Sequence, residues 1–355
     1  MEQSGSLSWQ QFDPDAGALK GRPQAIAGQI TLVSGPNYLP ISASATGRLA
    51  YWGGQRTETE LLWFDREGRA IGQPLSPGRA RYDNPELSPD NKQALVADWS
   101  LGRRDLYSIA VDNGVPTKLT FAPAQGRAGI WSPDGASIGY STLSAGVASI
   151  ARKPSTGGGE ETTITDFRDA LAVIATDWSH DGNRIVYHVT TPTGGWDIGY
   201  VDVQNGAQRP IAAGAGNQVQ GKLSPDGTLL AYASDESGTW EAYVSSLTSR
   251  RKWQVSLGGG GGTQPRWRRD GKELFYVALD GTLNAVPVSS GSGSLHIDGP
   301  TQRLFQMRAA PMLAPYRMKY AARSDGAQFL VSSAVVDAPP QTITVVDNWR
   351  SATIK

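Results

Sequence analysis

The sequence predicts an all-β fold, a single β-propeller, from two observations. A tight turn recurs along almost the whole chain, and its seven copies end at residues 47, 91, 135, 182, 227, 271 and 326. This spacing is close to the period of a four-stranded propeller blade, about 40–45 residues. Between the turns, β-branched and aromatic residues alternate with polar ones, a period of two that is typical of strands.

The turn itself has a local explanation, shown most fully by Ser132-Pro133-Asp134-Gly135. Pro presets the backbone angle φ of the first central position, Asp bonds to its own backbone, and Gly supplies the positive φ that closes the hairpin. The repeated Asp is therefore predicted to stabilise the turn in every blade and not to bind a metal.

One repeat shows the strand order expected in each blade. A short inner strand ends at Leu87, a second strand covers Ala94 to Ala97, a third Asp105 to Val111, and an outer one Thr117 to Thr120. A large apolar residue precedes five of the turns, always in the same register, and is therefore predicted to pack between blades and not to form a platform for sugars. These residues are Leu87, Trp131, Trp178, Leu223 and Trp267.

The blade count and the closure of the ring follow from the spacing of the turns and the strand order of the repeat. Residues 41–318 hold six repeats, and residues 319–355 hold a partial last one. We expect strands in residues 1–30 to complete this last blade, which removes exposed sheet edges. The leading prediction is one domain over residues 1–355 with seven four-stranded blades, and six or eight blades remain alternatives.

Composition narrows the classes of partner. Lys and Arg together number 33, as do Asp and Glu, so no excess of charge favours nucleic acid or an anionic membrane surface. The chain has no cysteine, which excludes disulfides and thiolate chemistry, and no apolar run long enough to span a bilayer. We expect a monomer whose partner is a protein, a peptide or a small molecule.

The turns and the strands around them resemble TolB-type, WD-like propeller repeats over nearly the whole chain. Three segments are similar to the propeller that follows the membrane segment in many soil-bacterial serine/threonine kinases: Leu62 to Gly68, Trp253 to Ser256 and Gln264 to Tyr276. This resemblance implies an extracytoplasmic (periplasmic) sensor or protein-binding domain, a fragment of a larger membrane protein. It supplies no catalytic residue, because no kinase motif occurs in the sequence.

The candidate site is the central channel, since the segments just before each turn are expected to approach the ring axis. Asp83 and Asp177 are the candidate carboxylates for catalysis or for a Ca²⁺ ion, whose preferred ligands are oxygens. Pairing of the channel carboxylates, Asp83, Glu86 and Asp177, with Arg127, Arg266 or Arg317 is the alternative. The candidate ligand-binding side chains are Asn84, Glu86, Arg127, Gln220, Gln264 and Arg317.

Two functions follow from this candidate site. The first is a non-catalytic binding module, a sensor or scaffold that presents one face of a rigid ring. The second is a Ca²⁺-dependent propeller hydrolase with weak activity on lactones, esters or phosphotriesters. Ser137 matches a nucleophile-elbow pattern, but it is expected at the start of a strand and not at a strand-to-helix turn.

Overall fold

The computed structural model describes residues 7–27, 41–44, 46–52, 58–75, 80–100, 104–121, 126–249, 251–308, 317–335 and 343–347. The chain divides into two compact units, residues 58–334 and the two flanking segments taken together. This division differs from the single domain predicted for residues 1–355. No helix occurs in the described residues, so none of them forms a helical membrane span.

Residues 58–334 fold into six antiparallel sheets, here called blades 1 to 6 in chain order of their inner strands. Blade 1 is β7 (Tyr82–Leu87), β8 (Gln93–Asp98), β9 (Asp105–Ala110) and β10 (Pro116–Lys118); blade 2 is β11 (Gly129–Trp131), β12 (Ser137–Ser144), β13 (Val147–Pro154) and β14 (Thr162–Phe167). Blade 3 is β15 (Ala172–Trp178), β16 (Arg184–Thr190), β17 (Trp196–Asp202) and β18 (Gln208–Ala212); blade 4 is β19 (Gln218–Leu223), β20 (Leu229–Ser234), β21 (Glu241–Ser246) and β22 (Lys252–Gln254). Blade 5 is β23 (Thr263–Trp267), β24 (Glu273–Val277), β25 (Thr282–Gly291), β26 (Ser294–Ile297) and β27 (Gln302–Gln306); blade 6 is β28 (Tyr320–Ala322), β29 (Gln328–Ala334), β5 (Thr59–Asp65) and β6 (Ala70–Ile71).

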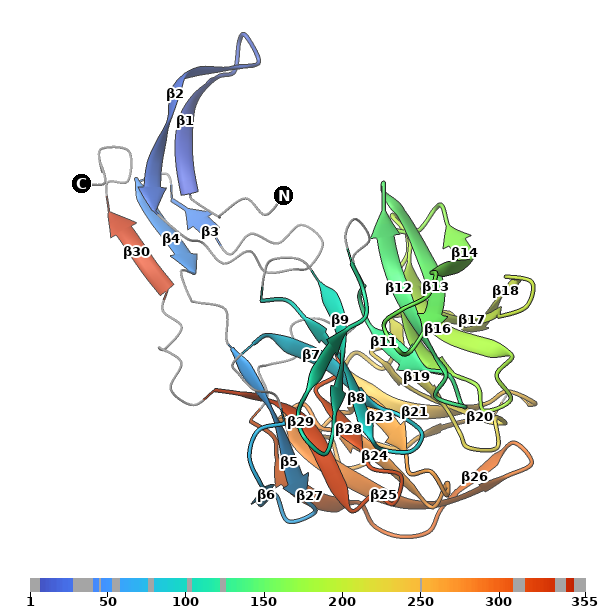
Figure 1. Cartoon of the computed structure of the whole chain (residues 1–355). Helices are drawn as coiled ribbons and strands as arrows, with labels where there is room; N and C mark the ends of the chain where they lie inside the picture. The colour runs from blue at the N-terminus through green and yellow to red at the C-terminus, as the bar shows by residue number, and fades with distance from the viewer. Residues whose placement is uncertain are drawn as a thin grey trace. The chain divides into compact units, whose positions relative to one another are not determined.

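Six apolar clusters, one at each seam between neighbouring blades, close these sheets into a ring. At the seam of blades 1 and 2, for example, Leu95 packs with Tyr140. The seam of blades 6 and 1 is filled in the same way by Leu330 and Val96. The fold is therefore the predicted all-β propeller (Figure 1). Its core is distributed around the ring, seam by seam.

Blade 6 closes the ring with strands from both ends of the unit. Its inner strands β28 and β29 come late in the chain, and β5 pairs with β29 from Thr59↔Ala334 to Asp65↔Gln328 (Figure 1). The N-terminal closure predicted for residues 1–30 is thus made instead by residues 59–71. The sequence analysis counted residues 41–318 as six repeats, so Leu61 to Asp65 fell in a first blade of its own and not in the last one.

The other unit contains two small sheets. The hairpin of β1 (Leu7–Asp13) and β2 (Ala18–Ala27) pairs only with itself among the described residues. The second sheet joins β3 (Ile41–Ala43), β4 (Arg48–Trp52) and β30 (Ile343–Asp347). The turn ending at Gly47 connects β3 to β4, so six of the seven predicted turns lie in the ring, where seven blades were the leading prediction.

The recurring turn has the predicted mechanics. In blade 2, Ser132 Oγ donates to Asp134 Oδ1 (2.5 Å) and accepts from the Ser137 amide (2.9 Å), while Gly135 has φ 72°. The same Ser–Asp pair occurs in blades 1, 3 and 4. The turn aspartate is therefore a structural residue in these blades.

Candidate functional site: the channel and the pit at its mouth

The inner strands of blades 1, 4 and 5 each carry a bulge at the same register position. The strand pairing is interrupted there, and Asn84, Gln220 and Gln264 have φ of 53°, 61° and 54°. Such left-handed conformations are uncommon for residues other than glycine and persist where the surroundings hold them. Here the bulge turns the amide side chain along the ring toward the neighbouring blade.

These three amides form what we call the amide belt. Gln220 Oε1 accepts the backbone N–H of Gln264 (2.7 Å), Gln264 Oε1 that of Lys319 (2.6 Å), and Asn84 Oδ1 that of Met318 (2.6 Å). All three amide residues are buried. Their acceptor oxygens satisfy buried backbone donors across blade seams, so Asn84, Gln220 and Gln264 link neighbouring blades.

His188 of β16 ends the belt. Its Nδ1 accepts the backbone N–H of Gln220 (3.2 Å), which requires the neutral tautomer with the proton on Nε2. Burial also lowers the pKa of His188 to about 3, because the charged imidazolium would lose its hydration.

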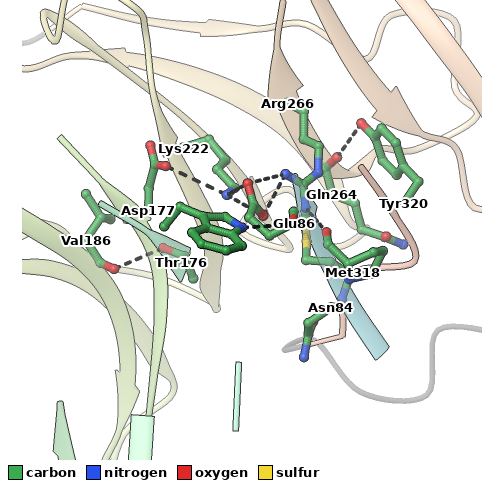
Figure 2. Close-up of polar contacts among 12 residues, drawn as sticks. Asn84, Glu86, Thr176, Asp177, Val186, Lys222, Gln264, Arg266, Met318 and Tyr320 are labelled. Carbon is green, nitrogen blue, oxygen red and sulfur yellow. Dashed lines mark hydrogen bonds and ion pairs between the residues drawn. The ribbon is translucent and has the colours of Figure 1, made fainter. Parts of the chain in front are cut away.

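Two residues closer to the turns, four charged side chains meet across the channel, and we call them the ion cluster. Glu86 lies between Lys222 Nζ (3.1 Å) and Arg266 Nη1 (2.8 Å), and Asp177 Oδ1 lies 3.8 Å from Lys222 Nζ (Figure 2). Arg266 also donates to the Pro85 carbonyl (3.0 Å). Because blades 1, 3, 4 and 5 each contribute one member, the cluster links the ring across its axis.

The two carboxylates of the ion cluster differ in electrostatics. Burial opposes ionisation of Glu86, but the charges of Arg266 and Lys222 outweigh burial and hold the pKa of Glu86 below its usual value. For Asp177, burial outweighs Lys222 and the Leu223 amide, which donates to Asp177 Oδ2 (2.7 Å), and the pKa is raised. Glu86 therefore carries the stable negative charge of the cluster.

The remaining predicted residues lie near Asp83 or blade 2. Asp83 is buried and pairs with Lys319 Nζ and with Arg317 Nη1 (3.2 Å). Arg127 lies just before β11, and its backbone N–H donates to the carbonyl of Ser141 (2.9 Å).

These carboxylates do not fit the Ca²⁺ site that the sequence suggested. Asp83 and Glu86 already face two cations each, and Asp177 and Glu86 share Lys222. No group of three or more acidic or histidine side chains suited to a metal occurs within the described ranges. A hard cation needs several oxygen ligands that are not engaged by basic side chains.

A cavity of about 360 Å³, here called the pit, opens above the ion cluster on the face of the recurring turns. Glu86, Asp177 and Arg266 line its base, and residues next to the turns of all six blades form its wall. Apolar side chains on that wall include Trp131, Trp178 and Trp267. The pit thus combines a charged base with aromatic sides, as small-molecule and peptide sites commonly do.

Sequence reasoning found Glu86, Asp177 and the Arg266 pairing, but missed Lys222 and Lys319. Both lysines are less than a tenth exposed and bond to carboxylates of other blades. A signal was present, because Lys222 precedes the turn of blade 4 at the position that Glu86 and Arg266 occupy in blades 1 and 5.

Comparisons with known proteins agree with this geometry. No known family profile matches the sequence. Solved structures that it resembles include β-propellers of the TolB type. A TolB-type protein from Agrobacterium tumefaciens matches with TM-score 0.62 and 20% identity over 79% of this chain and 99% of its own. TolB from Acinetobacter baumannii matches with TM-score 0.53 and 17% identity over 83% of this chain and 66% of its own. The fold is therefore that of a TolB-like propeller.

One curated relative is similar in sequence. It is an uncharacterized peptidase, YuxL, of Bacillus subtilis, 25% identical over 219 residues. The match spans 60% of this chain but only 31% of the peptidase. The relative therefore shares with this chain a segment that is about a third of its own length.

Proposed function

We propose that this propeller is a non-catalytic binding module that receives part of a protein, a peptide or a small ligand in the pit. The observation that supports it is the pit itself, to which all six blades contribute and whose base carries both signs of charge. The ion cluster is held by contacts between its own members, so it is organised before a ligand arrives. Such preorganisation reduces the entropic cost of binding.

The rim of the pit favours partners with acidic groups near one side. Arg269, on the turn of blade 5, is exposed and lines the pit beside Arg268. Arg268 is already paired with Asp270 and Glu273, whereas Arg269 donates to the Pro89 carbonyl. An acidic side chain of a ligand would therefore meet Arg269 first.

A hydrolase is the second candidate, supported only by the name of the similar peptidase. The serines of the pit do not favour it. The hydroxyls of Ser88, Ser132 and Ser224 donate to the aspartate of their own turn and accept a backbone N–H, so none donates to a histidine. A serine nucleophile needs a base that receives its proton. Ser137 lies in β12 after a hairpin turn, as expected from the sequence, and not at a strand-to-helix elbow.

The pit is tested by Ala322→Trp. Ala322 lines the pit at the position that Trp131, Trp178 and Trp267 occupy in other blades, so the fold already accommodates tryptophan there. Peptides selected from a random library on the unaltered chain should bind Ala322→Trp at least about tenfold more weakly by fluorescence polarisation. Ala327→Trp makes the same change at an exposed position outside the pit and should bind normally.

Two results would overturn the proposal. One is equal affinity of the selected peptides for Ala322→Trp and the unaltered chain. The other is reproducible turnover of ester, phosphotriester or peptide substrates that is lost in Asp177→Asn, which would assign catalysis to the channel.

We further propose that the module works outside the cytoplasm as part of a larger membrane protein. The support is the similarity of residues 62–68, 253–256 and 264–276 to kinase-associated propellers. Fractionation of the native cells with an antibody against the ring tests this proposal, and recovery of the ring in the cytoplasmic fraction would contradict it.

A further inference from the structure

A second cavity, of about 380 Å³, lies on the turn face at the seam of blades 1 and 2, and we call it the seam cavity. It adjoins the pit, because Ser88, Pro89 and Trp131 line both. Its other lining residues are almost all polar and uncharged or acidic: Asp90, Gln93, Ser108, Thr117, Asp134, Gly135, Ser155 and Thr156. Among the described residues, no lysine or arginine lines it.

The seam of blades 4 and 5 shows why this cavity exists. Gln93, Ser108 and Thr117 lie in strands two, three and four of blade 1, at positions that Leu229, Val244 and Trp253 occupy in blade 4. In blade 4 these apolar side chains pack against blade 5 within a core cluster. Small polar residues replace them in blade 1, so the outer part of that seam stays open.

The polar groups around the seam cavity keep free hydrogen-bonding capacity. Gln93 Oε1 accepts from Ser108 Oγ (2.9 Å), which leaves its amide NH₂ without a partner among the described residues. Asp90 and Asp134 use Oδ1 for their own turns, and their Oδ2 atoms accept no bond from the described part of the chain. The hydroxyls of Thr117 and Thr156 are likewise unengaged within that part.

We propose that the seam cavity binds a neutral, hydroxyl-rich ligand, namely a saccharide unit. Hydroxyl groups both donate and accept, so they match carboxylate oxygens, an amide NH₂ and threonine hydroxyls together. The two carboxylates and the lack of a lining cation oppose an anion, and an ammonium ion would leave the amide donor unused. Pro89 supplies an apolar surface for the C–H face of a sugar ring, whereas Trp131 is buried in the seam and forms part of the cavity wall. The volume is within the usual range for small-ligand sites.

The first test is binding of D-glucose and N-acetylglucosamine to the full chain, by saturation-transfer NMR and calorimetry. We expect binding that disappears in Ser108→Val/Thr117→Trp, which gives blade 1 the side chains of blade 4 at two of these three positions and fills the cavity. A melting temperature equal to or above that of the unaltered chain shows that this variant folds. Binding that persists in the filled variant, or its absence for both sugars, would overturn the proposal.

A second variant keeps the cavity open. Asp134→Asn retains the Oδ1 acceptor that holds the turn but replaces a free carboxylate oxygen with a donor, and should weaken sugar binding about tenfold. Asp181→Asn makes the same change in the turn of blade 3 and should have no effect. Equal losses in both variants would contradict the site.

Two further ligands separate the remaining possibilities. Glucuronate should bind more weakly than glucose, and tighter binding of glucuronate would refute the charge argument. If the natural ligand is a glycan, the trimer of N-acetylglucosamine should bind more tightly than the single sugar. If the natural ligand is a free sugar, the two should bind equally. Either result supports the site. Ala322→Trp should leave sugar binding unchanged, so failure of the pit and failure of the seam cavity are distinguishable.

Discussion

The amide belt and the ion cluster lie two residues apart in the inner strands of blades 1, 4 and 5, yet they differ in charge, in burial and in the groups they bond to. The belt residues Gln220 and Gln264 are neutral, almost fully buried and bonded to the backbone of a neighbouring blade. The cluster residues Lys222 and Arg266 are charged and meet Glu86 at the base of an open cavity. In each of these inner strands, the bulge therefore separates the amide belt, which joins the blades, from the ion cluster, which lies at the base of the pit.

The largest expected effect tests the belt. Gln264→Leu removes the acceptor of the buried Lys319 N–H and places a leucine at φ 54°. We expect a loss of about 3 kcal/mol in the free energy of unfolding, the sum of an unsatisfied donor and a disfavoured conformation. Urea unfolding measures it, and Gln302→Leu, at an exposed site, should change stability by less than about 0.5 kcal/mol. Similar small losses in both variants would show that the belt does not hold the ring together.

A smaller effect is expected in the ion cluster. Glu86→Gln leaves Lys222 and Arg266 without their shared carboxylate and should cost about 2 kcal/mol at pH 7, less than for a fully buried pair because Glu86 is 21% exposed. The pKa of Glu86 is lowered in the fold, so this stabilisation is present above its ordinary pKa and lost as the pH falls through the lowered value.

The difference between the unaltered chain and Glu86→Gln should therefore shrink in acid. Urea unfolding at pH 7 and near pH 3 measures this change, and Glu160→Gln is the exposed control. A difference that stays constant with pH would mean that Glu86 acts by packing and not by charge.

The smallest effect has the opposite sign. The pKa of Asp177 is raised in the fold, so its ionisation opposes folding above its ordinary pKa, and this cost disappears as the carboxyl is protonated in acid. Asp177→Asn removes the charge while its amide oxygen can still accept from Leu223, and should stabilise the chain by up to about 1 kcal/mol at pH 7. Thermal unfolding measured against pH should show that the gain in stability of Asp177→Asn vanishes below about pH 4, near the ordinary pKa of aspartate. A clear loss of stability at pH 7 would mean that the attraction between Asp177 and Lys222 outweighs the cost of burying the charge.

The sequence predicted the repeat accurately because each turn is determined locally. The predicted third strand of blade 1, Asp105 to Val111, matches β9 to within one residue, and the turn aspartates hold their own loops. The pairing of Glu86 with Arg266 was foreseen only as an alternative, since it joins residues far apart in the chain. The belt could not be foreseen, because a positive φ at Asn84 or Gln220 depends on contacts with the next blade.

The pairing of Thr59 with Ala334 places the entrance and the exit of the ring side by side. In mechanical terms, tension applied through the two flanking segments would not load the six blades in series. It would separate β5 from β29 one residue pair at a time, starting at Thr59 and Ala334, which is the geometry of a zipper and not of a shear joint. In protein engineering terms, the ring resembles a domain inserted at one point of a host chain, so it could be transplanted into an exposed loop whose two ends lie as close together as adjacent strands.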